Sequence, residues 1–82
     1  MSMQLNEEAQ WIVGQLTETS GMTLSVDSPL LDSGLLDSMA IQDLVAEIEE
    51  RHGFTIPDDE LTEENFESAS AIANLIGRLR NV

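Results

Sequence analysis

The apolar residues near the start of the chain recur at i, i+4, i+7 and i+11. This spacing puts them on one face of an α-helix: Leu5, Ala9, Ile12 and Leu16. Gly21 follows and is a favourable residue for ending a helix. Trp11 falls off the stripe, so we expect it to be half-exposed or covered by a loop. The pattern predicts a first amphipathic helix that ends before residue 21.

A second helix is predicted from Ser38 to His52, with Gly53 ending it. At 100° per residue, four apolar side chains fall on one arc and form the expected core face: Ile41, Leu44, Val45 and Ile48. A third helix is expected after Ser68, which is a good N-cap residue. Its apolar positions form one stripe: Ile72, Leu75, Ile76 and Leu79. Its last turn contains Arg78 and Arg80, where the helix dipole favours cations.

Two connections separate the predicted helices. The first, roughly residues 19–37, is long for a small protein, and such loops are often functional. The second, residues 57–68, is acidic, and we expect Leu61 and Phe66 to anchor it and a short extra helical turn to form within it. Since no alternating pattern is long enough for a strand, the sequence predicts an all-α fold. We expect a small antiparallel three- to four-helix bundle, with residues 1–82 forming a single domain.

The amino-acid composition limits the class of protein to which this chain can belong. Hydrophobic residues make up 41% of the 82, enough for one core. The chain has no Cys and one His, so we expect neither a disulfide framework nor a dedicated metal site. The first ten residues lack the features of a signal peptide, and no stretch approaches the roughly 18 apolar residues of a membrane span. We therefore expect a monomeric cytoplasmic protein.

The charge is strongly one-sided. Three arginines face sixteen acids, which gives a net charge of −13. Phosphate backbones and anionic membranes repel such a chain, so we expect no binding to nucleic acid or membrane. The acids are either a solvated surface or a means of attracting basic partner proteins.

The second predicted helix has an unusual polar face. Met39 lies almost opposite the core arc, among Asp43, Ala46 and Glu50, with Glu47 alongside. Lone surface methionines are common, and Met39 could also fold over the loop. Methionine nevertheless suits surfaces that must fit several partners. We favour a docking surface for a basic, partly apolar groove.

The phrase Leu-Leu-Asp-Ser occurs twice, ending at Ser33 and at Ser38. Ser33 precedes Gly34 with no helical pattern after it, so the first copy is interpreted as a turn. Ser38 begins a helix, where it could serve as the N-cap or hold a phosphate ester in the field of the helix dipole. His52 lies at the far end of that helix, so Ser38 has no base to make it a nucleophile. We expect the leucine pairs to fasten the loop to the bundle: Leu30, Leu31, Leu35 and Leu36.

No catalytic constellation is recognisable. Asp27, Asp32 and Asp37 are spaced five apart, which does not match a calcium-binding loop. There is neither a glycine-rich dinucleotide motif nor a phosphate-binding loop. We expect a protein that is not an enzyme, with no catalytic residues and no bound metal.

The segment GLLDSM followed by AIQDLVAEIEERHGFTIPDDEL resembles the acyl carrier proteins, and the resemblance extends over most of the chain. It implies that Ser38 receives 4′-phosphopantetheine from coenzyme A through a separate phosphopantetheinyl transferase. The thiol of that arm would hold acyl or aminoacyl cargo as a thioester. Loading ligases or transferases and downstream enzymes with basic docking surfaces would be the other partners. The residues that such partners contact would be Asp37, Met39, Asp43, Ala46, Glu49 and Glu50.

Some residues differ from the usual family pattern. Met39 stands where leucine is frequent, Gln42 and Ala46 replace larger apolar residues, and His52 occupies a usually aromatic position near Phe54. These differences favour a specialised carrier in lipid, polyketide or peptide-type biosynthesis over the housekeeping fatty-acid carrier. The main alternative is an acidic helical adaptor without a prosthetic group, in which Ser38 is only a helix cap. An acidic mimic of nucleic acid is a weaker alternative.

Overall fold

The computed structural model describes residues 2–21 and 23–80, with side chains described apart from those of residues 2–6, 19, 20 and 38. Three α-helices form the fold: α1 (Ser2–Ser20), α2 (Ser38–His52) and α3 (Ala69–Arg80). Two short 3₁₀ helices, η1 (Asp58–Glu60) and η2 (Glu64–Phe66), lie between α2 and α3. The described residues contain no strand, so the predicted all-α bundle is confirmed.

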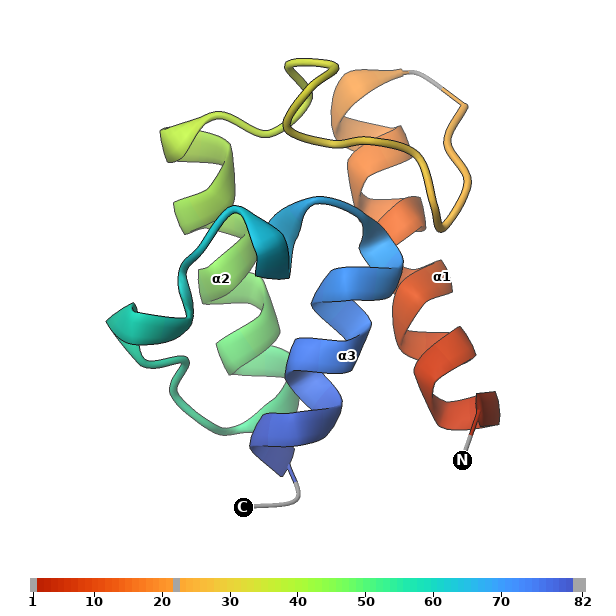
Figure 1. The fold of residues 1–82 in the computed structure, drawn as a ribbon. Helices are drawn as coiled ribbons and strands as arrows, with labels where there is room; N and C mark the ends of the chain where they lie inside the picture. Colours follow the sequence, from red (N-terminus) through yellow and green to blue (C-terminus); the bar gives the residue numbers. More distant parts are fainter. Residues whose placement is uncertain (1, 22, 81–82) are drawn as a thin grey trace.

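The helices surround a shared core. α1 runs opposite to α2 and α3, and residues 23–37 form a loop that leads to the start of α2 (Figure 1). The backbones of α1 and α3 approach each other closely, whereas those of α1 and α2 lie further apart. Among the described helices, none combines the length and apolar character needed to cross a bilayer.

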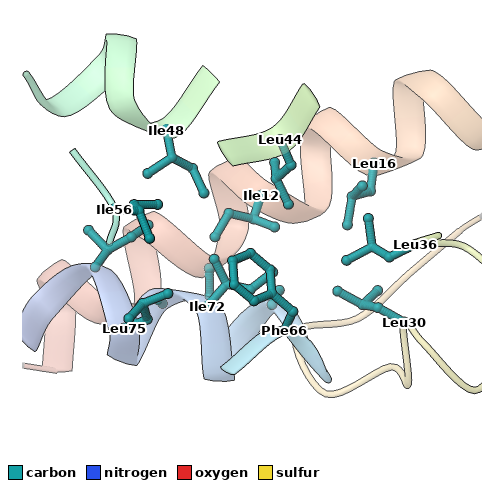
Figure 2. Packing of buried hydrophobic residues seen from close by; sticks show 14 residues of the cluster. Ile12, Leu16, Leu30, Leu36, Leu44, Ile48, Ile56, Phe66, Ile72 and Leu75 are labelled. Atoms are coloured by element: carbon teal, nitrogen blue, oxygen red, sulfur yellow. The ribbon is translucent and has the colours of Figure 1, made fainter. Parts of the chain in front are cut away.

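The core draws side chains from all three α-helices and from both connections (Figure 2). On α2, Leu44 and Ile48 are buried, and Ile41 and Val45 pack against them at its edge. The predicted core faces are therefore confirmed, although the side chain of Leu5 lies outside the described part. The buried residues are Ala9, Ile12, Leu16, Leu30, Leu36, Leu44, Ile48, Ile56, Phe66, Ala69, Ile72, Ala73, Leu75 and Ile76.

The helix ends follow the local chemistry of the chain. Gly21 and Gly53 have φ angles of 73° and 75°, a left-handed conformation that glycine adopts without a steric penalty. At the start of α3, the Ala71 N–H donates to Ser68 Oγ at 3.1 Å. The glycine stops and the Ser68 cap are therefore confirmed.

The 57–68 connection differs from its prediction. It holds two 3₁₀ turns instead of one, and only one of the two expected anchors is buried. Phe66 is 1% exposed, whereas Leu61 is 38% exposed, so the expectation for Leu61 was wrong. Polar contacts hold this connection in place of a buried Leu61. Asn65 Nδ2 donates to the Glu60 carbonyl at 2.8 Å, and Arg78 Nη2 donates to Asn65 Oδ1 at 3.1 Å.

A partly buried acid joins the ends of the three helices. Glu8 Oε1 lies 3.0 Å from His52 Nε2 and 3.7 Å from Arg51 Nε, and Glu8 Oε2 lies 3.7 Å from Arg80 Nη1. The Arg51 guanidinium also covers the Trp11 ring, with Cζ 4.6 Å from the ring centroid. Trp11 is half-buried as expected, but an arginine of α2 covers it and not a loop.

We expect Glu8→Ala to lower the free energy of unfolding by about 1–3 kcal/mol, the usual effect of leaving a buried partner of a charged hydrogen bond unpaired. The main loss is at His52, because Arg51 and Arg80 remain partly exposed and regain water. Urea unfolding followed by circular dichroism measures the change. The control is Glu7→Ala at the exposed neighbouring position. Equal midpoints for the two variants would contradict a structural role for Glu8.

Candidate functional site

The start of α2 is capped by Asp37. Its backbone is extended, with φ −106° and ψ −174°, and its Oδ1 accepts a hydrogen bond from the Ala40 N–H at 2.8 Å. The Asp37 carbonyl accepts from the Ile41 N–H at 2.9 Å, which closes the first turn. The expectation that Ser38 could serve as the N-cap is therefore wrong. Ser38 is the first helical residue, and the Asp37 side chain before it caps the helix.

The loop before Asp37 is fixed to the bundle. The Leu30 N–H donates to the Glu67 carbonyl at 2.9 Å, and the Leu36 N–H donates to the Leu30 carbonyl at 3.0 Å. Leu30 and Leu36 are buried, while Leu31 and Leu35 pack at the edge of the core, as predicted. These contacts hold the backbone that leads into Ser38. Its side chain lies outside the described part, so its exposure remains a prediction.

The first Leu-Leu-Asp-Ser copy forms a turn. The Ser33 hydroxyl donates to the Leu30 carbonyl at 3.3 Å, and the Gly34 N–H donates to the Leu31 carbonyl at 3.1 Å. Gly34 has a φ of 81°, so the chain reverses there and no helix follows Ser33. The two similar phrases thus have different structures, as the sequence indicated.

Met39 lies on an exposed, acidic side of α2. Its side chain is 77% exposed, and four of the residues predicted beside it are exposed as well. We call this group the α2 face: Met39, Asp43, Ala46, Glu47 and Glu50. Its three carboxylates are exposed, and the ion pairs of the described arginines are made with Glu8 and Glu60 outside this face.

Glu49 does not belong to the α2 face. It is partly buried, and its Oε2 accepts a hydrogen bond from the Ile56 N–H at 2.7 Å. The carboxylate thereby holds the chain where it leaves α2. The helical pattern alone could not reveal this contact, because the residue that Glu49 meets lies seven positions later in an irregular segment.

A recess of about 370 Å³ lies beside the capped start of α2. Its wall is mixed polar and apolar, and the exposed Leu61 forms part of it. Its lining residues are Leu31, Leu36, Asp37, Ile41, Leu61, Thr62, Glu63 and Phe66. The sequence pattern predicts this recess only weakly, since Leu61 is an isolated apolar residue in an acidic segment.

The titratable groups offer little chemistry near Ser38. His52 is paired with Glu8 at the opposite end of α2, roughly 20 Å away at the axial rise of a helix. No group of three or more His, Cys, Asp or Glu among the described residues is arranged to hold a metal ion. What the start of α2 does offer is the positive end of a helix dipole, an environment that favours a phosphate.

Residues 10–76 match the protein family described as the phosphopantetheine attachment site. The D-alanyl carrier protein of Listeria monocytogenes is 33% identical over 78 residues, which cover 95% of this chain and all of that protein. The lincomycin biosynthesis protein LmbN of Streptomyces lincolnensis is 45% identical over 56 residues, which cover 68% of this chain and 20% of that protein.

Two solved structures have similar folds. One is the Bradyrhizobium japonicum glycine:[carrier protein] ligase complexed with glycylated carrier protein. Its matching chain is 29% identical with a TM-score of 0.68, and the match covers 87% of this chain and 96% of that one. The other is described as an FAD-dependent dehydrogenase. There the identity is 35% and the TM-score 0.71, with 84% of this chain and 97% of that one covered.

Proposed function

This chain belongs to the family of carrier proteins that bear covalently bound 4′-phosphopantetheine, and from that membership we propose that Ser38 is its attachment residue. Carriers of this family hold acyl or aminoacyl groups. When attached, the arm supplies a thiol that holds such a group as a thioester. The chain itself has no Cys, so the prosthetic group would be its source of reactive sulfur.

The cap at Asp37 is the observation that carries the proposal. Because the Asp37 carboxylate accepts the Ala40 N–H, Ser38 is not needed to cap α2. It occupies the first helical position, where the positive end of the helix dipole favours an anion such as a phosphodiester. The rival view, an adaptor in which Ser38 is only a cap, loses its main support.

The rigid loop gives the arm a fixed origin. Leu30 and Leu36 anchor the backbone before Ser38, so the arm would swing from a defined point next to the α2 face. A tethered cargo meets a docked active site at high effective concentration. Docking through exposed charges is weak and fast, which suits a carrier that must visit a transferase, a loading ligase and later enzymes. The catalysis would belong to those partners, and the 82 residues would act as one carrier domain.

We propose that the cargo is a small amino acid loaded by a ligase. The similar proteins include a D-alanyl carrier and a glycylated carrier in complex with its ligase. These relatives support a specialised aminoacyl pathway over fatty-acid or polyketide synthesis.

Intact-mass spectrometry tests the attachment. The native protein is incubated with coenzyme A and a broad-specificity phosphopantetheinyl transferase, with a known carrier as positive control. We expect the mass to increase by one phosphopantetheine. An unchanged mass beside a modified control would overturn the proposal.

We expect Met39→Ala and Asp43→Lys to lower the kcat/KM of ligase loading at least about tenfold, corresponding to about 1.4 kcal/mol of lost docking energy at this exposed face. Helical content should not change, because neither side chain supports the core. The control is Asp59→Lys, which makes the same charge change at an exposed site in η1. Normal loading of both α2 variants, or an equal loss in the control, would show that the docking face lies elsewhere.

A further inference from the structure

A second feature borders the α2 face: a groove of about 280 Å³ between α1 and α2. It occurs where the backbones of these helices lie further apart than those of α1 and α3. Residues of α1, the loop and α2 all contribute to its lining: Gln15, Leu16, Leu35, Ala40, Asp43, Leu44, Ala46 and Glu47. Figure 2 shows Leu16 and Leu44 on the two helices that flank it.

The groove combines an apolar floor with an acidic edge. Leu16 and Leu44 are buried beneath it, and Leu35 is partly buried. Asp43 and Glu47 are exposed and four residues apart on α2, so their side chains are neighbours on one helix face. Like charges at this spacing repel each other, and a cation placed between them would relieve the repulsion.

Among the residues that the structure describes, no arginine is paired with this edge. The chain has three arginines and no lysine, and all three arginines contact acids outside the groove. Arg51 and Arg80 contact Glu8, and Arg78 contacts Glu60 at 3.5 Å. A side chain that pairs with Asp43 and Glu47 would therefore come from another molecule.

We propose that this groove receives an arginine side chain of a partner enzyme, which makes α1 part of the docking surface. The inference rests on the proposed carrier function and extends its partner surface beyond α2. The methylene stem of an arginine can lie on Leu16, Leu35 and Leu44 while its head remains at the edge. A planar guanidinium can donate to two carboxylates at once, which a lysine ammonium does less well.

The small side chain at position 40 keeps the groove open. Ala40 lies on the groove side of α2, partly buried and without atoms beyond Cβ. A leucine there would occupy the space that the arginine stem needs and would leave both carboxylates in place. Ala40→Leu therefore separates the shape of the groove from its charge.

The test uses butylguanidinium as the probe and the unmodified native chain labelled with ¹⁵N. We expect backbone amide shifts confined to the groove, with half-saturation on the order of 10 mM for so small a ligand, and weaker binding when salt is added. Neutral butylurea, which has the same shape, should shift these amides at least about fivefold less at equal concentration. Equal shifts with butylurea, or butylguanidinium shifts spread evenly over the acids of residues 57–68, would overturn the proposal.

Three variants complete the test. Ala40→Leu should reduce the butylguanidinium shifts of Asp43 and Glu47 at least about threefold, whereas Gln42→Leu, which adds a leucine to the same helix outside the groove, should not. If Ala40→Leu fails to fold, the double variant Asp43→Asn with Glu47→Gln provides the decisive measurement. Retained shifts in that double variant would contradict the inference.

These titrations do not involve coenzyme A, so they can fail while the mass test at Ser38 succeeds. In that case the carrier function stands and only the arginine groove is rejected. The reverse result, a groove that binds butylguanidinium on a chain that accepts no phosphopantetheine, would reject the carrier function and leave a cation-binding docking surface.

Discussion

Replacing Ser38 with alanine is expected to abolish the mass increase that coenzyme A and a phosphopantetheinyl transferase produce, whereas Ser33→Ala is expected to leave it complete. Both serines follow Leu-Leu-Asp, but Gly34 follows Ser33 whereas a helical pattern follows Ser38. Their backbone conformations differ accordingly. Ser38 begins α2 behind the Asp37 cap, while Ser33 lies in a turn and donates its hydroxyl hydrogen to the Leu30 carbonyl.

Ser33→Ala is a sensitive control because it removes the same hydroxyl from nearly the same phrase. Its hydrogen bond is long, at 3.3 Å, and only partly buried, so its loss should cost no more than about 1 kcal/mol of stability. Proteolysis of the modified native chain should place the added mass on the fragment that contains Ser38. A modified Ser38→Ala chain would transfer the assignment to another hydroxyl, and a loss in Ser33→Ala would show that the loop turn is required.

The second large effect is expected from Phe66→Ala, which should lower the free energy of unfolding by about 3–5 kcal/mol. Phe66 is 1% exposed and lies in the middle of the core, close to residues of α1, α3 and the loop (Figure 2). A protein of this size has a total stability of roughly 5–15 kcal/mol, so such a loss leaves a substantial unfolded fraction at physiological temperature. Phe66 also lines the recess beside Asp37, so its removal should loosen the start of α2.

Leu61→Ala is the matched control in the same connection. Leu61 is already 38% exposed, and Asn65, Glu60 and Arg78 hold this segment through polar contacts. We expect a change of less than about 1 kcal/mol, as for most surface substitutions. Urea unfolding of the two variants and the native chain gives the comparison. A Leu61→Ala loss as large as that of Phe66→Ala would mean that the connection depends on Leu61 after all.

The contrast between these two residues shows where sequence reasoning reaches its limit. Both are apolar residues in an acidic, non-periodic segment, and nothing in their spacing distinguishes a buried side chain from an exposed one. Within regular helices the spacing is informative, because the 3.6-residue repeat fixes which side chains share a face. The exposed position of Met39 and the burial of Ile48 could therefore be predicted from the pattern alone.

The amino-acid sequence by itself determined the three helices, their glycine stops, the apolar faces, the acidic surface and the different structures of the two Leu-Leu-Asp-Ser phrases, because each depends on residues close together in the chain. Only the folded structure shows that Asp37 caps α2 and that the Glu49 carboxylate accepts the Ile56 N–H. It likewise shows that Glu8 lies beside His52 and that a groove opens between α1 and α2. Such contacts join residues that are distant in sequence or lie in irregular segments, and the separation of two helix backbones depends on how all their side chains pack together.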